Sequence, residues 1–569
     1  MNITHLMILF SLLVQLSCNK KSDKIIRASI KSEVTTIDPH RSYDLVSNII
    51  VYQMYEPLYQ LHYLKRPYTL EPLLAKEMPS ISSDGKVYTI KIKKNILYHN
   101  KDNLFTEKTY VKPQDFLNSF KRIAFKKTDS KGWWLFKDKI IGLNEFRENA
   151  HTIDDFFKIP VKGIIIPDDE TVIIKLTKRY PQFIHNLSMA FTVPIPDHAI
   201  KKFKNNLEDK DIGTGPFELV SIDKDKEIKL KKFKGYKTSV YPSTGDREAN
   251  ERKLLKRVNA KLPLSEQLHF RVIGDDSERW KNFQDSQLDF VDIPAKELDK
   301  ILDSTGDLKK NYKDKGARLD INSSLIFWWL AFNMKDPIVG KNKLLRKAIS
   351  HAFNMNKYIE NFYFHTGRIA NSLYPPGVPG YSPTHKYPFE YNLAKARKLM
   401  VEAGFPEGKG LPVLEFNTRR DSERHIIMAQ YVKRELNKIG ISVRIVVNTF
   451  KEFLSKAKTG KMQLWQGGWL MDYPEPENIL QLLYSKNANG GPNKTSFNNP
   501  KFDQLFESYS ISDDEFINQK VLKEMQKIVI EEVPWIFSNY TIHYHARDKG
   551  LKNFRFSDLI FNFYKYLEK

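Results

Sequence analysis

The sequence has a single cysteine, Cys18, among its 569 residues. One thiol excludes an intramolecular disulfide and any metal site built from several cysteines. Beyond the N-terminal segment, no run reaches the roughly 18 apolar residues of a membrane-spanning helix. The chain also has no HExxH, GxSxG, P-loop or GxGxxG motif, which argues against the enzyme classes that these motifs mark. A pair of acids across a cleft, as in glycosidases, leaves no such motif and stays open.

Arginine-rich arms, zinc-finger spacings and RNP-like aromatic motifs are missing too, although the formal net charge is +23. A basic chain suits a nucleic-acid binder, but here the lysines are spread along the whole length. We therefore expect no nucleic-acid partner and interpret the charge as that of a generally lysine-rich protein. It would still attract anionic surfaces, including lipid headgroups.

The N-terminal segment that ends at the cysteine is the only long apolar stretch. Residues 6–18 read LMILFSLLVQLSC and are followed by Asn19 and two lysines. This pattern resembles the signal peptide of a bacterial lipoprotein, in which the cysteine becomes the lipidated first residue. We expect residues 1–18 to be such a signal peptide and Cys18 to anchor the exported protein to a membrane. An ordinary secretory peptide with an incidental cysteine is the alternative, and it also implies export.

The remaining chain has a globular composition, with 41% hydrophobic and 12% aromatic residues. Its length exceeds what one compact core accommodates, so we expect two or three lobes. Alternation and turn signals predict strands at 28–39, 82–96 (a hairpin turning at Asp84-Gly85), 162–176, 217–233, 270–273, 288–293, 413–418 and 443–447. Helical periodicity predicts helices at 45–61, 112–123, 279–286, 344–353, 393–403 and 425–439.

This mixed order of strands and helices indicates α/β lobes rather than a bundle or a sandwich. Residues 237–262 are polar and basic, and we expect them to form an exposed insertion.

Several short segments then follow one another in a characteristic order. They are TIDPH (36–40), YEPLYQL (55–61), the hairpin region 71–100, GTGPFELVSI (213–222), FQDSQLDFVDIP (283–294), YPPGVPGY (374–381), GGWLMDYPEPEN (467–478) and EEVPWIF (531–537). Taken together and in this order, they make the chain similar to solute-binding protein family 5, the dipeptide- and oligopeptide-binding components of ABC importers. The resemblance covers almost the whole chain after the leader.

The resemblance implies a two-lobed fold of the periplasmic-binding-protein type II, in its large form with an extra domain, which closes on its ligand like a hinged clamp. It divides the chain into a discontinuous first lobe (19–55, 191–320 and 537–569), an extra domain of that lobe (56–190) and a second lobe (321–536).

The resemblance also implies a ligand site around Asp472. In peptide-binding members, the acid of a WxxDY motif pairs with the α-ammonium group of the ligand, and Asp472 occupies that place. A carboxylate that loses water between aromatic rings favours a cationic partner. The implied ligand-binding residues are Asp472, Trp469, Leu470, Tyr473, Phe450, Tyr43 and Leu45. The alternative for Asp472 is a structural acid in the turn before Pro474.

One departure concerns the ligand carboxylate. Some peptide-binding members place arginines shortly before the WxxDY motif, where this chain has Ala457 and Gln466. Three alternatives stay open. Lys456 or Lys458 binds the ligand carboxylate, or contacts at the carboxylate end do not fix the length of the ligand. The third is that the ligand is a sugar, a metal chelate or another amine-bearing solute. For Trp133 and Trp134 two interpretations stay open with equal weight: they form part of the cleft wall, or they pack in the core.

The function expected from the resemblance is that of a non-enzymatic, monomeric receptor. It would capture short peptides outside the cytoplasmic membrane and deliver them to the permease subunits of an ABC transporter. The rivals are the same fold with a non-peptide solute, and a secreted hydrolase. We expect no cofactor and no metal, because His543 and His545 share one strand face without further ligands.

Overall fold

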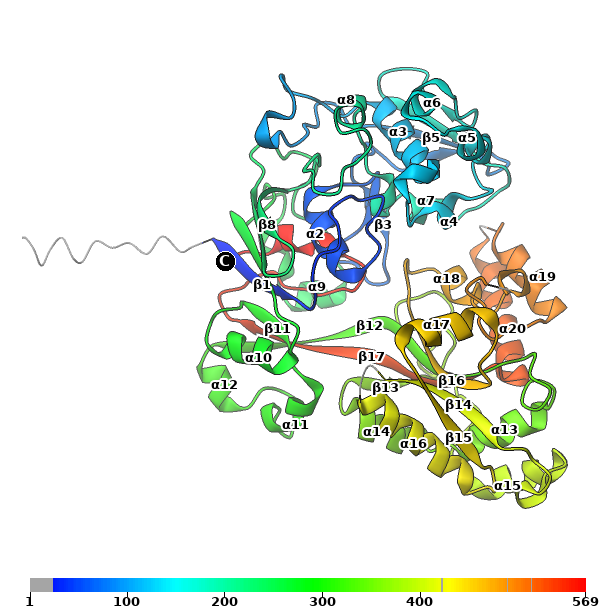
Figure 1. Cartoon of the computed structure of the whole chain (residues 1–569). Coiled ribbons are helices and arrows are strands. Elements are labelled where there is room, and N and C mark those ends of the chain that lie inside the picture. The colour runs from blue at the N-terminus through cyan, green and yellow to red at the C-terminus, as the bar shows by residue number, and fades with distance from the viewer. Residues whose placement is uncertain (1–23, 421–422, 489, 513) are drawn as a thin grey trace, which may run out of the picture.

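The computed structural model describes residues 24–420, 423–488, 490–512 and 514–569. They form two bodies, one across the top and left of Figure 1 and the other at the lower right, joined where two long strands pass between them. The predicted signal peptide and Cys18 lie outside the described residues. None of the described helices combines the length and apolar composition that crossing a bilayer requires.

The first lobe is built on a four-stranded sheet with the order β1-β10-β9-β8. β1 runs parallel to β10, and the other neighbours are antiparallel. Buried and accessible residues alternate along β1 and β9, as the period of two requires. The elements are β1 (Ile25–Ile30), α2 (Leu45–Met54), α8 (Asp197–Lys202), β8 (Phe217–Asp223), β9 (Glu227–Lys232), α9 (Arg247–Glu251), β10 (Gln267–Val272), α10 (Asp276–Gln284), α11 (Leu298–Ile301) and α12 (Lys310–Asp314).

A smaller sheet, β4-β5-β7-β6, and several helices occupy the region predicted as the extra domain. The predicted hairpin turn is confirmed, since Gly85 has a positive φ of 70° between β4 and β5. The elements are β2 (Tyr59–Leu61), β3 (Leu70–Pro72), β4 (Ser80–Ile81), β5 (Val87–Lys91), α3 (Pro113–Ala124), α4 (Trp133–Phe136), α5 (Leu143–Asn149), α6 (Ile153–Lys158), β6 (Ile164–Ile165), β7 (Thr171–Lys175) and α7 (Phe183–Asn186).

Two long antiparallel strands, β12 (Ala317–Phe332) and β17 (Trp535–Asp548), cross from the first lobe into the second. They belong to a seven-stranded sheet with the order β11-β17-β12-β16-β14-β15, and β13 pairs with β17. The pairing of β12 with β17 shifts register between Ser323 and Phe327. The other strands are β11 (Phe290–Asp292), β13 (Gly367–Ile369), β14 (Leu414–Arg419), β15 (Val443–Asn448) and β16 (Leu464–Leu470).

Helices cover both faces of the second-lobe sheet. Phe327 and Trp329 of β12 belong to one core cluster, and Leu330 and Phe332 belong to another, as expected for side chains that alternate across a strand. The helices are α13 (Lys343–Ala352), α14 (Met355–Tyr363), α15 (Leu393–Glu402), α16 (Glu423–Asn437), α17 (Phe450–Thr459), α18 (Pro476–Leu480), α19 (Pro500–Tyr509) and α20 (Glu515–Glu532).

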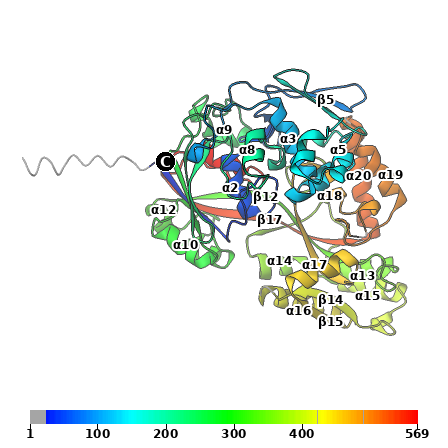
Figure 2. The same ribbon diagram turned by 45° about the horizontal axis from the view of Figure 1, so that its top comes forward.

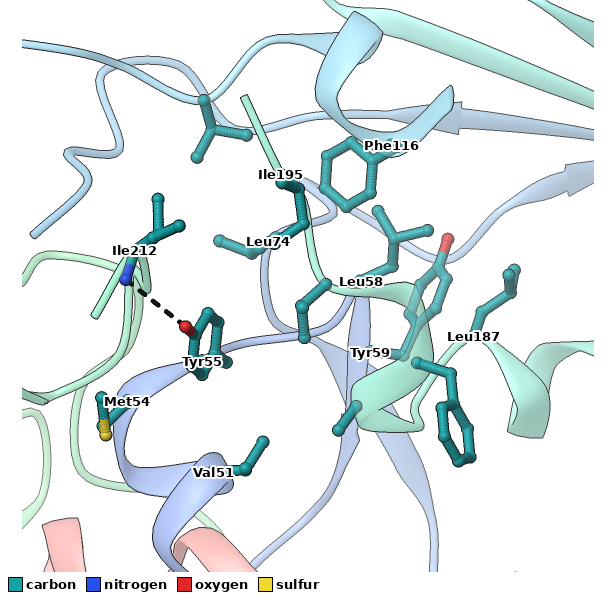
Figure 3. Close-up of a cluster of buried hydrophobic side chains, with 14 of the residues drawn as sticks. Val51, Met54, Tyr55, Leu58, Tyr59, Leu74, Phe116, Leu187, Ile195 and Ile212 are labelled. Atoms are coloured by element: carbon teal, nitrogen blue, oxygen red, sulfur yellow. Dashed lines mark hydrogen bonds between the residues drawn. The ribbon is translucent and has the colours of Figure 1, made fainter. Parts of the chain in front are cut away.

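One continuous core connects the first-lobe sheet with the extra-domain region. Figure 3 shows its centre, where residues from α2 and the segment that follows, such as Met54 and Leu58, meet Phe116 of α3. Tyr55 points into the same core, and its hydroxyl accepts a hydrogen bond from the Ile212 backbone N–H at 3.4 Å.

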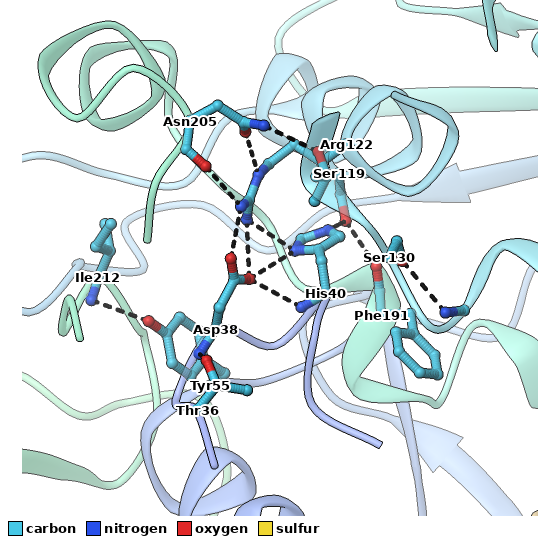
Figure 4. A network of polar contacts seen from close by, with 12 residues as sticks. Thr36, Asp38, His40, Tyr55, Ser119, Arg122, Ser130, Phe191, Asn205 and Ile212 are labelled. Atoms are coloured by element: carbon cyan, nitrogen blue, oxygen red, sulfur yellow. Dashed lines mark hydrogen bonds and ion pairs between the residues drawn. The ribbon is translucent and has the colours of Figure 1, made fainter. Parts of the chain in front are cut away.

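Two predicted elements are shorter than expected. The strand predicted for 28–39 ends at Ile30, because the chain beyond it turns to bring Asp38 against Arg122 of α3 at 2.8 Å (Figure 4). The helix predicted for 45–61 ends at Met54. Pro57 disfavours helical geometry in the residue before it, and the chain continues into β2.

The segment 237–262, which was expected to form an exposed insertion, is exposed over much of its length but is anchored to the first lobe at several points. Tyr241 is fully buried, and its hydroxyl donates to the Leu254 carbonyl at 2.7 Å. Arg555, near the C-terminus, donates to Asp246 and to Glu248, both at 2.9 Å. The polar composition therefore reflects ion pairs that tie this segment to the first lobe.

Candidate functional site

A cavity of about 330 Å³ lies between the two lobes. The first lobe contributes the start of α2 and the 188–191 and 558–562 segments, and the second lobe contributes residues 468–474. Such a volume lies at the lower end of the range of small-molecule sites. The polar and aromatic lining residues include Ser42, Tyr43, Asn48, Tyr52, Gln60, Phe191, Trp469, Asp472, Tyr473, Asp558 and Asn562.

The two glycines before Trp469 allow β16 to lie close to two tryptophans of β12. Gly467 is paired with Trp329, and Gly468 with Trp328. A Cβ on Gly467 would lie 2.4 Å from Trp329 Nε1, and one on Gly468 would lie 2.3 Å from Trp328 Cε3. These glycines therefore set the path of the strand that carries Asp472 into the cavity.

The Asp472 carboxylate is held from both lobes. The Tyr43 hydroxyl, from the first lobe, donates to Asp472 Oδ1 at 3.2 Å. Asn478 Nδ2, from α18, donates to Asp472 Oδ2 at 3.3 Å. Asn478 Oδ1 in turn accepts hydrogen bonds from the Asp472 backbone N–H at 3.1 Å and from Trp469 Nε1 at 2.8 Å.

The electrostatic setting of Asp472 is that of an acid without a cation. Burial raises the pKa of the Asp472 carboxyl above its usual value, and the hydrogen bonds from Asn478 and Tyr43 offset part of that rise. Among the described residues that line the cavity, none is Lys, Arg or His. All donors to the carboxylate that the structure shows are neutral, so the charge there favours a cationic guest.

The neighbours of Asp472 in sequence lie where the prediction placed them, around the same cavity. Trp469, Leu470 and Tyr473 all line it. Tyr473 is buried, its hydroxyl donates to Glu477, and its ring stacks on His185 of α7 with centroids 5.6 Å apart. This stretch therefore contacts the cavity and the extra-domain region together.

Tyr43 and Leu45 line the cavity from the other lobe. Both stay partly accessible, with exposed fractions of 42% and 50%. Asp44 between them caps α2, because its Oδ1 accepts from the Ser47 backbone N–H at 2.8 Å. The cap fixes the turn that directs the Tyr43 hydroxyl at Asp472.

Phe450 is not brought to this cavity. It begins α17, is 51% exposed, and its ring lies 5.6 Å from the guanidinium carbon of Arg419. The two tryptophans of α4 also do not line the cavity. Trp133 packs against Arg147 at 4.6 Å, which supports the core-packing interpretation, and Trp134 is exposed.

The residues considered for the ligand carboxylate also lie outside the cavity lining. Lys456 donates to Asn448 Oδ1 at 2.6 Å, Lys458 is exposed, and Gln466 donates to the Tyr363 hydroxyl at 2.8 Å. Arg419, at the end of β14, was not predicted. β14 and β16 are parallel, so Arg419, at the carboxyl end of β14, lies at the same end of the sheet as Asp472, which follows β16.

Two further residues of the site escaped the sequence analysis. Asn478 is fully buried and forms hydrogen bonds with both Trp469 and Asp472. It is the last residue of the segment GGWLMDYPEPEN, but no sequence motif marks it as a site residue. Asp558 lines the cavity and pairs with His543 Nε2 at 3.1 Å. No sequence signal identifies Asp558, because it reaches the cavity only where the C-terminal segment folds back onto the first lobe.

His543 and His545 pair with acids. His545 Nε2 lies 2.9 Å from Asp292. Burial lowers the pKa of His543, but Asp558 and Asp292 outweigh it and raise the pKa above its usual value. Within the described residues, no group of three or more His, Cys, Asp or Glu side chains is arranged to hold a metal ion.

The chain is similar to known binding proteins over most of its length. It is 26% identical to the di/tripeptide-binding protein 1 of Pseudomonas aeruginosa, over 84% of this chain and 82% of that protein. It is also 26% identical to the heme-binding protein A of Haemophilus influenzae, over 82% of this chain and 78% of that protein.

The fold is shared with the periplasmic binding protein DppA of Helicobacter pylori, solved in complex with the peptide STSA. That comparison has a TM-score of 0.73 at 23% identity and covers 96% of this chain and 98% of the other. It confirms the expected two-lobed α/β fold.

The family profile described as bacterial extracellular solute-binding proteins, family 5 (middle region), matches residues 69–491, which is more than half of the chain. The cavity between two lobes, joined by crossing strands, is the architecture that such a clamp requires. The chain therefore belongs to the bacterial extracellular solute-binding proteins of family 5, which are extracytoplasmic binding proteins rather than enzymes.

Proposed function

We propose that this protein binds short peptides through their free amino terminus and delivers them to the permease of an ABC importer. The observation that carries the proposal is the Asp472 carboxylate, which faces a cavity whose described lining has no cationic side chain. The names of similar proteins, a di/tripeptide-binding protein and a peptide complex among them, support the same substrate class.

An α-ammonium group matches what the Asp472 carboxylate lacks. Its three N–H donors and positive charge replace the water that the carboxylate loses on burial. Trp469, Leu470 and Tyr473 wall the bound peptide, since aromatic faces accept varied side chains. Tyr43 and Leu45 meet it from the first lobe, so a bound peptide contacts both lobes and favours the closed clamp.

Arg419 is our candidate for the carboxylate end of a peptide long enough to extend beyond the cavity, because Arg419 itself lies outside the cavity lining. Phe416 and Asn417 of β14 pair with Leu464 and Trp465 of β16. If this register continues, Arg419 lies opposite Gly467 of β16, a few residues before Asp472 in the chain. Ligands bind at the carboxyl ends of parallel strands in open α/β sheets.

The test compares matched peptides by calorimetry. A dipeptide panel with free amines should bind, and the same peptides with an acetylated amine should bind far more weakly. Asp472→Asn should reduce the affinity for free-amine peptides by about a hundredfold or more, because breaking a buried charge pair costs about 3–5 kcal/mol. Equal affinities of the wild type and Asp472→Asn would disprove the ammonium clamp.

Asp558→Asn is the matched control, since Asp558 lines the same cavity but is already paired with His543. Asp558→Asn keeps Asp472, so it should discriminate free from acetylated amines as strongly as the wild type does. Denaturing the purified protein and identifying the released compound by mass spectrometry would name the natural ligand. Incubation with the same peptides should leave them intact, because we propose no hydrolytic activity.

The second candidate ligand is a metal chelate, which the similarity to a heme-binding protein favours. Anionic chelates such as a porphyrin with propionates fit poorly beside Asp472 and Asp558 when no described lining residue is cationic. Titration with haem while the Soret band is followed separates this candidate from peptides.

We also propose that Cys18 becomes the lipidated first residue after residues 1–17 are removed, which would anchor the protein as a monomer beside its permease. Cys18→Ser should release the protein from membranes into the soluble fraction. For the lobes we propose the division stated above, with β12 and β17 as the crossings.

A further inference from the structure

A groove of about 740 Å³ on the first lobe, away from the ligand cavity, is rich in basic side chains. It lies between the 252–257 segment, the start of β12, the end of β17 and the 551–554 segment. We call it the basic groove. Its charged lining residues are Arg252, Lys253, Lys256, Arg257, Arg547, Lys552, Asp320 and Glu568.

The two acids of the basic groove are already matched by arginines. Asp320 pairs with Arg252 and, at 2.6 Å, with Arg547, and Glu568 pairs with Arg257. Lys253, Lys256 and Lys552 are exposed, and they make no ion pair within the described part of the chain. The groove therefore presents a surplus of positive charge to the solvent.

The basic groove lies beside the point where the N-terminal segment joins the fold. The Arg27 backbone N–H donates to Asp289 Oδ2 at 2.7 Å, and Lys569 Nζ donates to Asp289 Oδ1 at 2.5 Å. Glu568, the neighbour of Lys569, pairs with Arg257 of the groove. In Figure 1 the C-terminus accordingly lies next to the start of β1.

Chain length limits how far this face can be from a membrane. Six residues lead from Cys18 to Lys24, the first described residue. A fully extended chain spans at most about 3.6 Å per residue, so a lipidated Cys18 lies within about 20 Å of the first lobe. The same face would then stay near the bilayer surface, where anionic headgroups attract basic clusters.

We propose that the basic groove docks on anionic lipid headgroups and fixes the orientation of the first lobe on the membrane. The proposal rests on the lipid anchor proposed above, which holds the groove within reach of the bilayer. A basic patch next to a lipid chain adds a second membrane signal. The second lobe would then open and close over a fixed first lobe.

Three lysines supply most of the expected binding. Each Lys near an anionic surface contributes about 1 kcal/mol, so the three together account for about a hundredfold in vesicle affinity. The attraction is screened by salt, because the Debye length is about 10 Å at 0.1 M and about 3 Å at 1 M.

The experiment measures co-sedimentation of the full chain carrying Cys18→Ser with vesicles, so that no lipid anchor contributes. Vesicles of phosphatidylcholine alone report any binding by the apolar leader, and vesicles with phosphatidylglycerol added report the anionic contribution. We compare K253Q/K256Q/K552Q with the control K395Q/K433Q/K451Q, which neutralises three exposed lysines of the second lobe. Both triple variants carry the same net charge.

We expect the groove variant to bind anionic vesicles ten- to hundredfold more weakly than the Cys18→Ser protein without further changes. The control variant should lose little affinity. In high salt the difference between the two triple variants should disappear. Equal binding of the two triple variants would overturn the proposal. So would unchanged vesicle binding together with lost transport, which would assign the groove to an acidic protein partner. Release of the native protein by Cys18→Ser tests the anchor separately, and peptide affinity should not change in either triple variant.

Discussion

Asp472 shows how a residue obtains its property from two lobes. Its neighbours in sequence, Trp469 and Tyr473, line the cavity, but the donors to its carboxylate come from Asn478 and from Tyr43. The carboxylate has room for about four hydrogen bonds, so an ammonium group can join these donors without displacing them. Tyr43 then acts as a neutral partner that helps to keep the acid ionised.

This role predicts the effect of Tyr43→Phe. Losing one hydrogen bond to a carboxylate costs about 1.5–3 kcal/mol when it is buried, and the partial exposure of Tyr43 reduces that figure. We expect a three- to tenfold loss of affinity for free-amine peptides at neutral pH, measured by calorimetry. The loss should grow as the pH falls, because the Asp472 pKa is already raised and would rise further in the variant. Acetylated peptides should show no change between the two proteins.

At the scale of elements, a buried ionic cluster joins α3 to the segment after β1. Arg122 is fully buried and donates to Asp38 Oδ2 at 2.8 Å and to Asn205 Oδ1 at 2.7 Å (Figure 4). Arg122 and His40 hold the pKa of Asp38 well below its usual range, although burial alone would raise it. The segment is therefore held in place by charge pairing rather than by a β ladder.

Arg122→Met should destabilise the protein by about 3–5 kcal/mol, because it leaves the Asp38 carboxylate buried without its cation. Urea unfolding followed by fluorescence measures the change. The double variant Asp38→Asn/Arg122→Met removes both charges and should be closer to the wild type than Arg122→Met is. A double variant less stable than Arg122→Met would contradict the pairing.

The same cluster predicts loss of stability in acid. Burial and the Arg122 guanidinium lower the pKa of His40 to about 4 from an ordinary 6.5. As the pH falls from 6.5 towards 4, the unfolded chain takes up a proton that the folded one refuses, so the free energy of unfolding decreases by up to about 3 kcal/mol. Asp38 adds a loss of the same sign below pH 3.8. Unfolding at pH 7 and pH 4.5 should show a smaller difference for His40→Gln than for the wild type.

At the scale of the whole molecule, the cavity that we propose as the ligand site lies where two separately packed cores meet. β12 and β17 take part in both bodies (Figure 2). The register shift between Ser323 and Phe327 lies around the point where β12 begins to pair with β16 of the second lobe. Closure over a ligand can therefore bend a few strand residues while both cores stay intact.

A bound peptide should make the molecule more compact and more stable. At a ligand concentration of about 100 times Kd, mass action adds about 2.7 kcal/mol to the free energy of unfolding. We expect a smaller radius of gyration in X-ray scattering and a higher Tm with free-amine peptides. Both changes should be much smaller with Asp472→Asn at the same peptide concentration, because a hundredfold loss of affinity reduces the added free energy to about 0.4 kcal/mol. A rise in Tm without compaction would place the binding within one lobe.

Much of the local structure could be predicted from the sequence. The hairpin at Asp84-Gly85, the α/β order and the second-lobe helices α13, α15 and α16 follow from turn residues and periodicity, which act over a few residues. Predictions failed where distant partners decide, as in the strand that ends at Ile30, beyond which Asp38 pairs with Arg122 of α3. Charge pairs and burial supplied by other parts of the chain overrode the local pattern there.

The sequence by itself determined the family, the α/β class and the acid at Asp472, because these depend on residue identity and short spacing. Only the tertiary structure decided that Tyr43 and Asp558 line the same cavity as Asp472, that Asn478 donates to the Asp472 carboxylate, and that Phe450 does not line the cavity. The physical reason is chain separation: Tyr43 and Asp472 are 429 positions apart, and no local preference can specify their 3.2 Å contact. It arises when two independently packed lobes are set against each other by the strands that cross between them.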